Sequence, residues 1–252
     1  EAVARRVGEA ASRGTTLVFG CPLPADRGIT NSLLAFRDGR LLATYHKRLL
    51  PTYDVFDEDR YFLRGDQPVV IDVAGVPVGL SICEDLWKGE DVGFSHRYRD
   101  LPDPVAALVQ AGAKVIINPS ASPFVLGKGA RHRDLLKRHA VKHGVCVAAV
   151  NQVGGNDELI FDGHACAFDP AGNLLVAAPG FTETLCTVDL PATSAGPTPT
   201  DPLLTASSDA LTFHALRLGL ADYCRKTGFR KVLLGLSGGI DSAVVAAIAG
   251  GS

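Results

Sequence analysis

The sequence of 252 residues contains no methionine, and its apolar runs fall far short of the roughly 18 residues that a membrane-spanning helix requires. The first residues are charged and helix-like and do not resemble a secretory signal. A complete translation product starts with methionine, so we expect this sequence to be a fragment with a processed or missing N-terminus. The short apolar runs exclude a protein that spans a membrane through helices.

The charge and cysteine patterns exclude further classes. The 25 basic and 27 acidic residues give a net charge of −2 without a long run of one sign, which argues against nucleic-acid or membrane partners. The six cysteines form no CxxC pair, a pattern typical of a reduced, cytoplasmic protein rather than a disulfide scaffold or zinc site. The seven histidines have no ligand spacing and predict no metal site.

Strands, helices and hairpins alternate up to about residue 190. Asp38-Gly39 and Ala74-Gly75 are tight-turn pairs between apolar runs, so the stretches 31–47 and 68–83 predict two hairpins. The other predicted elements are a buried strand over 15–23, strands over 113–120 and 145–153, a hairpin over 164–179, and helices over 1–13, 104–111 and 129–143. This alternation predicts an α/β layered domain with a mixed sheet.

The stretch 191–208 differs in kind, because it is rich in Pro, Thr and Ser and lacks periodicity. We interpret it as a linker between a domain over 1–190 and a second unit over 209–252. In that unit Ser208 is expected to cap a helix, and residues 231–237 (KVLLGLS) predict a buried strand before a glycine turn and a second helix. Such a small unit cannot bury its apolar faces alone, so it should be poorly ordered or lean on the first domain.

Two residues in the first domain are candidates for catalysis. Cys83 ends an apolar strand and is followed at once by Glu84 and Asp85. A nucleophile at a sharp strand end has an exposed side chain and nearby backbone N–H groups, although a cysteine in such a strand can also be a buried hydrophobe. Lys47 lies where a hairpin strand gives way to a loop, and by itself it could be a solvated lysine.

The combination of YHKRLLPTYDVFDEDRYFLRG with SICEDLW, whose cysteine lies 36 residues after Lys47, closely resembles the nitrilase (carbon–nitrogen hydrolase) superfamily. The resemblance covers about residues 1–190 and implies an α/β/β/α sandwich whose site pairs a Glu, a Lys and a Cys. It implies that Cys83 is the nucleophile, Lys47 the cation that stabilises the oxyanion, and Glu58 a supporting glutamate. A cation beside the thiol is also expected to favour the thiolate.

The general base of that superfamily has no counterpart in the sequence. The resemblance places it upstream of the strand that holds Cys21, and the glutamates Glu1 and Glu9 lie outside any matching motif. We therefore expect the fragment alone to be inactive as a hydrolase.

Within this superfamily, the segments LPTYDVFDEDRYF and NPSASPFVLGK most resemble the glutaminase domain of glutamine-dependent NAD synthetases. This resemblance implies that four residues hold glutamine: Tyr53, Glu84, Ser122 and Lys128. Each also has a plain structural explanation, such as a packed loop tyrosine, a turn cap or a lysine at a helix start. The cationic helix after them is expected to form a solvated or subunit-facing surface, although Arg131 could reach inward.

The last residues carry SGGIDSA, which resembles the SGGxDS pyrophosphatase loop of ATP-dependent amidotransferases and related adenylating enzymes. Glycines let the backbone approach phosphate, hydroxyls donate to it, and the following helix supplies oriented N–H groups. The acidic residue either holds Mg²⁺ or fixes the loop. The resemblance implies an ATP site formed by Ser237, Gly238, Gly239, Asp241 and Ser242.

Together the two resemblances imply a glutaminase joined to the start of a Rossmann-like adenylating domain that is cut short. The implied reaction releases ammonia from glutamine and uses it, with ATP and Mg²⁺ and no prosthetic group, to convert deamido-NAD to NAD. A homo-oligomer is implied by the family. Two alternatives stay open, a free-standing amidase of the same superfamily and a non-catalytic remnant.

Overall fold

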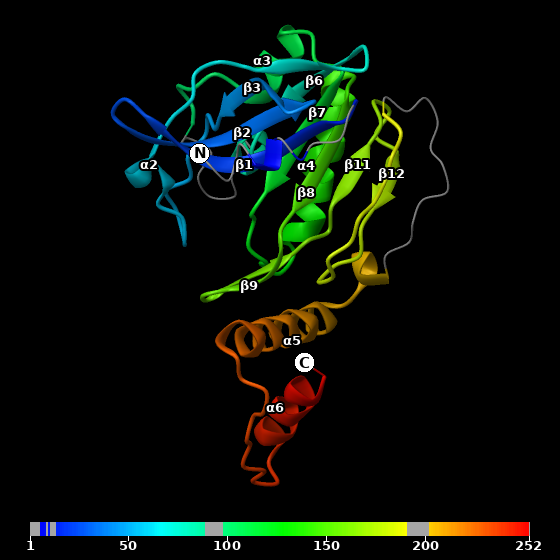
Figure 1. Ribbon diagram of the computed structural model, residues 1–252. Helices are drawn as coiled ribbons and strands as arrows, with labels where there is room; N and C mark the ends of the chain where they lie inside the picture. The colour runs from blue at the N-terminus through cyan, green and yellow to red at the C-terminus, as the bar shows by residue number, and fades with distance from the viewer. Residues whose placement is uncertain (1–5, 9, 11–13, 89–97, 191–201, 252) are drawn as a thin grey trace.

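The computed structural model describes residues 6–8, 10, 14–88, 98–190 and 202–251, and the bulk of it is built on two stacked sheets (Figure 1). The first sheet contains β1 (Thr16–Ala25), β2 (Gly28–Arg37) and β3 (Arg40–His46) in antiparallel order, and β4 (Phe62–Leu63) runs parallel to β2. The predicted hairpin turn at Asp38 and Gly39 is confirmed. Both residues have positive φ, as a tight turn between twisted strands requires.

The second sheet has six strands in the order β12-β11-β8-β7-β6-β5. Its centre is parallel and its edges are antiparallel, so the sheet is mixed, as the sequence predicts. The strands are β5 (Val70–Val73), β6 (Val76–Leu80), β7 (Val115–Ser120), β8 (Cys146–Asn151), β11 (Cys166–Phe168) and β12 (Leu174–Ala177). Their outer face is covered by α3 (Pro104–Gln110) and α4 (Lys128–His143), both close to their predicted positions.

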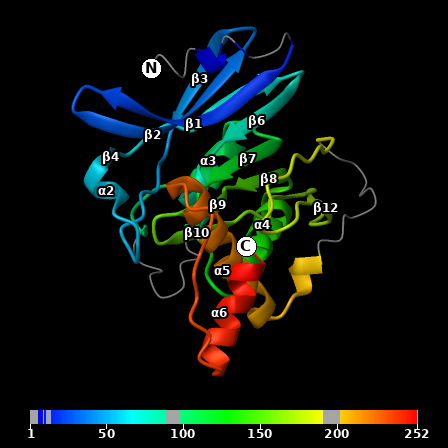
Figure 2. The ribbon, with the colours of Figure 1, turned by 60° about the horizontal axis from the view of Figure 1, so that its bottom comes forward.

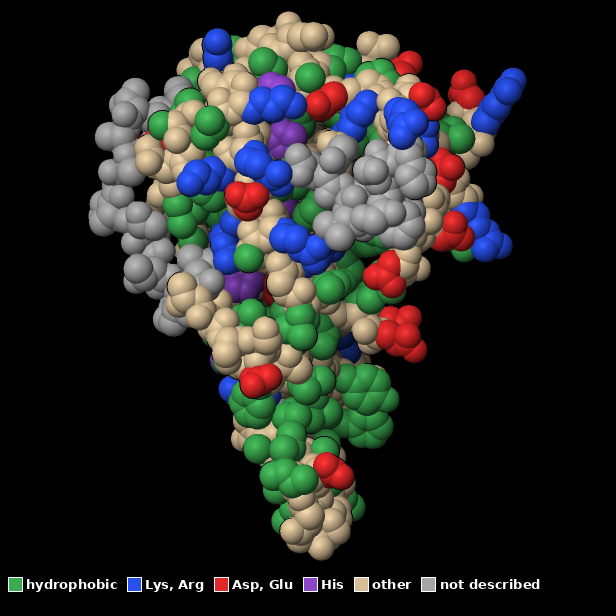
Figure 3. All heavy atoms as spheres, turned by 180° about the vertical axis from the view of Figure 1, so that it is seen from behind, with side chains coloured by type: hydrophobic (Ala, Val, Ile, Leu, Met, Phe, Trp, Pro, Cys, Tyr) green, Lys and Arg blue, Asp and Glu red, His purple; other side chains and the backbone are tan. Residues whose placement is uncertain are grey.

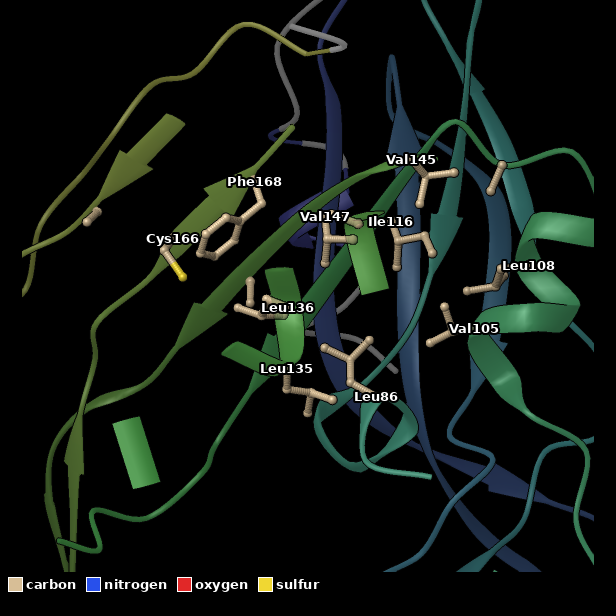
Figure 4. Packing of buried hydrophobic residues seen from close by; sticks show 14 residues of the cluster. Leu86, Val105, Leu108, Ile116, Leu135, Leu136, Val145, Val147, Cys166 and Phe168 are labelled. Atoms are coloured by element: carbon tan, nitrogen blue, oxygen red, sulfur yellow. The ribbon is translucent and has the colours of Figure 1, made fainter. Parts of the chain in front are cut away.

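Two hydrophobic clusters hold these layers together. Leu33 and Tyr45 of the first sheet pack with Val78 and Leu80 of the second, which closes the space between the sheets. Figure 4 shows the other cluster, in which side chains of α3 and α4 point toward β7, β8 and β11. On the far side of the first sheet, residues 6–8 are helical and Gly8 lies against the ring of Phe36. Most of the helix predicted over 1–13 lies outside the described residues.

The C-terminal unit rests on a separate two-stranded hairpin, formed by β9 (Val153–Asn156) and β10 (Leu159–Asp162). In Figures 1 and 2, α5 (Ser208–Thr227) lies across this hairpin. The buried carboxylate of Asp222 accepts a 2.9 Å hydrogen bond from Gly155 N, and Gly219 lies against Ile160. This agrees with the expectation that the segment leans on the first domain.

Three sequence expectations were wrong. Residues 231–237 are exposed and form no strand, because no described strand lies beside them to pair with their backbone. Leu233 is 101% exposed, and α6 (Ile240–Gly250) follows on the same projecting end, where hydrophobic side chains face solvent (Figure 3). The cap of α5 is Ser207 rather than Ser208, since the Ser207 hydroxyl accepts from Ala210 N. The strand β1 was expected to be buried but is half exposed, because it lies at the edge of the first sheet.

Candidate active site

Cys83 lies just beyond the end of β6, where the chain turns into a short 3-10 helix over Cys83–Leu86. Its φ of 42° is in the left-handed region that residues with a side chain rarely adopt. The turn directs the side chain onto the wall of a cavity of about 240 Å³ that opens to solvent. The sharp turn predicted at Cys83 is therefore present.

Lys47 directly follows β3, and hydrogen bonds from its backbone N–H and to its carbonyl fix its position. Its N–H donates to Asn31 O at 2.8 Å, and its carbonyl accepts from Gly65 N at 2.9 Å. The side chain is 1% exposed, and Nζ lies 2.6 Å from Oε1 of Glu58, the first residue of α2 (Glu58–Tyr61). The structure thus brings together the lysine and the supporting glutamate that the sequence resemblance selects.

The charges of Cys83 and Lys47 act on each other directly. Burial lowers the pKa of the Lys47 ammonium, but the charge that Cys83 carries once it is deprotonated and the Glu58 carboxylate outweigh this effect, and the pKa of Lys47 is raised. Burial raises the pKa of the Cys83 thiol, and Glu84 adds to this effect, while Lys47 and Lys128 oppose it. Lys47 therefore favours the thiolate, as expected, but the net pKa of Cys83 is raised. Desolvation of the sulfur is the stronger effect.

A thiol with a raised pKa is protonated at neutral pH. It becomes an effective nucleophile only when a base removes its proton as it attacks. A buried lysine that stays charged, in contrast, is well suited to stabilise negative charge that develops on a substrate oxygen. The arrangement therefore supplies a nucleophile and an oxyanion partner and requires a general base.

The cavity beside Cys83 has an apolar wall and a small set of charged groups. It is lined by Tyr53, Asp54, Val55, Phe56, Cys83, Glu84, Trp87, Ser122, Pro123, Val125, Lys128 and Arg131. All four residues predicted to hold the substrate are therefore present in one cavity, and Arg131 also faces it. Carboxylates and cations on the same wall suit a ligand that carries both charges.

Two tyrosines hold the carboxylate of Glu84, which is only 3% exposed. Tyr53 donates to its oxygens at 3.1 and 3.0 Å, and Tyr98 donates to Oε1 at 3.0 Å. Tyr98 is buried and lies 14 positions after Glu84, outside the motifs that carry the family resemblance, so sequence reasoning missed it. The carboxylate is fixed in direction before any ligand arrives.

On the opposite side, Asn151 anchors Ser122. Ser122 N donates to Asn151 Oδ1 at 2.8 Å, and Asn151 Nδ2 donates back to Ser122 O at 3.0 Å. Lys128, at the start of α4, donates to Pro123 O at 3.4 Å. Burial lowers the pKa of Lys128, and nearby Cys83 and Glu84 partly restore it.

A histidine behind the cavity wall was also missed. The ring of His132 stacks on Trp87 with 5.7 Å between centroids and 13° between planes. Burial, with the cations of Lys128 and Arg133, lowers the pKa of His132 to about 4. The imidazole is thus neutral at physiological pH and acts as a flat support for Trp87.

The predicted ATP-binding residues lie elsewhere, at the N-terminus of α6 on the projecting end (Figure 1). The hydroxyls of Ser237 and Ser242 are 3.2 Å apart, and Ser242 Oγ donates to Gly239 O at 3.0 Å. Gly238 has a φ of 84°, which glycine adopts without strain. Asp241 is exposed in the first turn of α6, which no side chain caps.

No group of three or more His, Cys, Asp or Glu residues in the described part of the chain could hold a metal ion. Within the same residues, every helix is too short or too polar to cross a membrane.

Comparison with known families divides the chain in two. The family profile for carbon–nitrogen hydrolases matches residues 1–200, and the profile for NAD synthase matches residues 212–251. A glutamine-dependent NAD(+) synthetase of Xanthomonas campestris is 44% identical over 248 residues, which are 95% of this chain and 42% of that protein. The chain thus spans about two fifths of the length of this curated relative.

Two solved structures are similar to this chain. The structure of glutamine-dependent NAD+ synthetase from Acinetobacter baumannii, with ADP, aligns with 98% of this chain and 44% of its own at a TM-score of 0.81 and 31% identity. An amidase from Nesterenkonia sp. AN1, in which acrylamide has added to the active site cysteine, aligns with 82% of this chain and 72% of its own at a TM-score of 0.59 and 28% identity.

Proposed function

Because this chain belongs to the carbon–nitrogen hydrolase family, we propose that its cavity binds glutamine and that Cys83 releases ammonia from the side-chain amide. One observation carries this proposal. The sulfur lies at a strained turn on the cavity wall, within electrostatic reach of the buried Lys47–Glu58 pair. The active site cysteine of the Nesterenkonia amidase supports the assignment of the nucleophile.

In the proposed reaction the sulfur of Cys83 attacks the amide carbon and its proton passes to a general base. The Lys47 ammonium and the backbone N–H of Glu84 stabilise the oxyanion. The C–N bond breaks, ammonia leaves with the proton returned by the base, and a thioester remains. Water then hydrolyses the thioester, which releases glutamate and restores the thiol. Lys47 does not serve as the base, because its raised pKa keeps it protonated.

The role proposed for Glu58 is to keep Lys47 charged and directed. Its Oε1 is 2.6 Å from Nζ, and its Oε2 accepts from Asn31 Nδ2 at 3.4 Å. The general base of the family has no counterpart in this sequence, and we assign none. Tyr53, Glu84, Ser122 and Lys128 are proposed to bind the amino-acid end of glutamine, with Glu84 facing the ammonium and Lys128 the carboxylate.

We propose that the second part of the chain begins the site that consumes the ammonia. There ATP adenylates the nicotinate carboxylate of deamido-NAD, and ammonia displaces AMP to give NAD. The match of residues 212–251 to NAD synthase and the name of the Xanthomonas relative support this assignment. Assembly into a homo-oligomer in the cytoplasm is part of the same proposal.

The loop before α6 fits the phosphates of ATP. Space for a Cβ is open around Gly238, the Ser237 and Ser242 hydroxyls can donate, and the uncapped helix start offers N–H groups. A Mg²⁺ ion held mainly by phosphates needs only one or two carboxylates, so Asp241 fits as its protein ligand. Such an ion would neutralise phosphate charge during adenylation.

Protection of Cys83 from iodoacetamide tests the choice of substrate. Alkylation located by peptide mass spectrometry needs no general base, so it can be measured on this chain. We expect glutamine to slow alkylation of Cys83, and Lys128→Ala to weaken that protection. Lys137→Ala, an exposed lysine on the same helix, is the matched control and should leave protection unchanged.

Equal protection by glutamine and by a simple aliphatic amide such as butyramide would contradict the proposal. Such a result would favour a free-standing amidase, an alternative that the structural similarity to the Nesterenkonia amidase supports. Absence of protection by either amide, with no labelling of Cys83 by an electrophilic glutamine analogue, would favour a non-catalytic remnant.

A further inference from the structure

Asp85 is a buried carboxylate two residues after the nucleophile, and its exposed fraction is 0%. A charge removed from water in this way is costly unless each oxygen is hydrogen-bonded. Burial raises the pKa of the Asp85 carboxyl, and hydrogen bonds from Tyr45, Ile82 and Leu49 oppose that rise. The proposed chemistry assigns no role to this group.

Four donors satisfy the two oxygens, and they come from two separate segments. Oδ2 accepts from Ile82 N at 2.9 Å and from the Tyr45 hydroxyl at 2.6 Å. Oδ1 accepts from Arg48 N at 3.0 Å and from Leu49 N at 2.9 Å. Every donor is thus within two residues of Cys83 or of Lys47.

We propose that Asp85 is a positioning residue that fixes the Cys83 turn against the Lys47 segment, so that sulfur and ammonium share one site. Its role in amide cleavage rests on the proposed function. Ile82 N belongs to the residue just before the strained turn, while Arg48 N and Leu49 N follow Lys47 directly. One carboxylate therefore determines the spacing of two residues that lie 36 positions apart in the sequence.

The direction in which the pKa of Cys83 shifts when Asp85 is neutralised distinguishes a positioning role from a simple effect of charge. If Asp85 acted only as a nearby anion, its neutralisation would favour the thiolate and lower the pKa of Cys83. If it positions Lys47, its loss moves the cation away from the sulfur and raises the pKa of Cys83. The two explanations thus predict opposite shifts.

The experiment is the pH dependence of Cys83 alkylation by iodoacetamide in Asp85→Asn. This variant keeps the size of the side chain but replaces one carboxylate oxygen with an NH2 group. That group cannot accept the hydrogen bonds of the donors that face it. We expect the pH midpoint of Cys83 alkylation to rise by about one unit in this variant. At a pH below the midpoint, alkylation should be about tenfold slower than in the wild type. Because iodoacetamide alkylates the sulfur by displacing iodide and no amide bond is cleaved, this result is independent of whether glutamine protects Cys83.

Asp169→Asn is the matched control. Asp169 is 5% exposed and accepts hydrogen bonds from Ala171 N and from Asn173 N and Nδ2, but it lies in the β11–β12 turn, away from the cavity. Its loss should lower thermal stability and leave the Cys83 midpoint unchanged. An equal shift of the midpoint in both variants would overturn the proposal, since general loosening would then explain it.

Tyr45→Phe provides a second variant in case Asp85→Asn does not fold. It removes one donor and leaves the carboxylate and its three backbone bonds in place. We expect a rise of the Cys83 midpoint in the same direction but smaller. An unchanged or lowered midpoint in a folded Asp85→Asn, or in Tyr45→Phe when Asp85→Asn is unfolded, would refute the positioning role.

Discussion

The ion pair between Lys47 and Glu58 can be tested with Glu58→Gln, which removes the charge and keeps the shape. The paired atoms are 2.6 Å apart, and the side chains are 1% and 18% exposed. Loss of one partner of a fully buried pair costs about 3–5 kcal/mol, because the other charge stays buried without compensation. Since Glu58 retains contact with water, we expect a smaller loss of about 2–3 kcal/mol in the free energy of unfolding.

Urea unfolding at pH 7 measures this loss, and Asp59→Asn on the same short helix is its control. Asp59 pairs with Arg64 at 3.5 Å, but these side chains are 55% and 38% exposed. Exposed pairs contribute little, so the control should lose no more than about 0.5 kcal/mol. Equal losses in the two variants would refute the reasoning, because burial would then not determine the strength of the pair.

The pH dependence of the same difference follows from the direction of the Lys47 shift. Its pKa in the folded protein is raised above the ordinary value of 10.5. A raised pKa stabilises the fold below the unfolded value, and the stabilisation is lost as the pH rises through the folded value. The gap between wild type and Glu58→Gln should therefore be constant near neutral pH and shrink above about pH 10.5.

Three further predictions concern stability and docking. The pKa of His132 is lowered to about 4, so unfolding free energy should fall as the pH drops from about 6.5 toward 4, and His132→Phe should flatten this slope in urea titrations. Leu233→Asp should change the unfolding free energy by less than about 0.5 kcal/mol, whereas Leu135→Ala, in the core, should cost about 2–5 kcal/mol. Asp222→Asn should weaken the contact of α5 with Gly155 and speed hydrogen exchange in α5 without changing exchange in α4.

The sequence predicts local features of the fold well because their causes are local. Asp38 and Gly39 adopt the positive φ values that a tight turn demands, and the hairpin follows from them. The convergence of Cys83 and Lys47 is not visible in periodicity, and it was expected only because a family pattern spans both residues. Contacts between distant segments need either such a pattern or coordinates.

Asp85 and the segment 231–237 illustrate what sequence reasoning misses. The donors to Asp85 on the Lys47 side lie 36 to 40 positions away, so its polar surroundings leave no trace in the residues beside it. The segment 231–237 has the apolar composition of a strand, but strands require neighbours, and none is present among the described residues. In both cases the deciding partner is remote along the chain.

The raised pKa of Cys83 reflects a balance that sequence inspection cannot weigh. Lys47 and Lys128 favour the thiolate, but desolvation of the sulfur by the surrounding protein outweighs them. A protonated thiol is a poor target for oxidants and stray electrophiles, so the free site is protected until a base acts on it. The same exclusion of water strengthens the pull of Lys47 on a developing oxyanion, because charges interact more strongly in a medium of low dielectric constant. Burial therefore weakens the nucleophile in the free site and favours the transition state once attack begins.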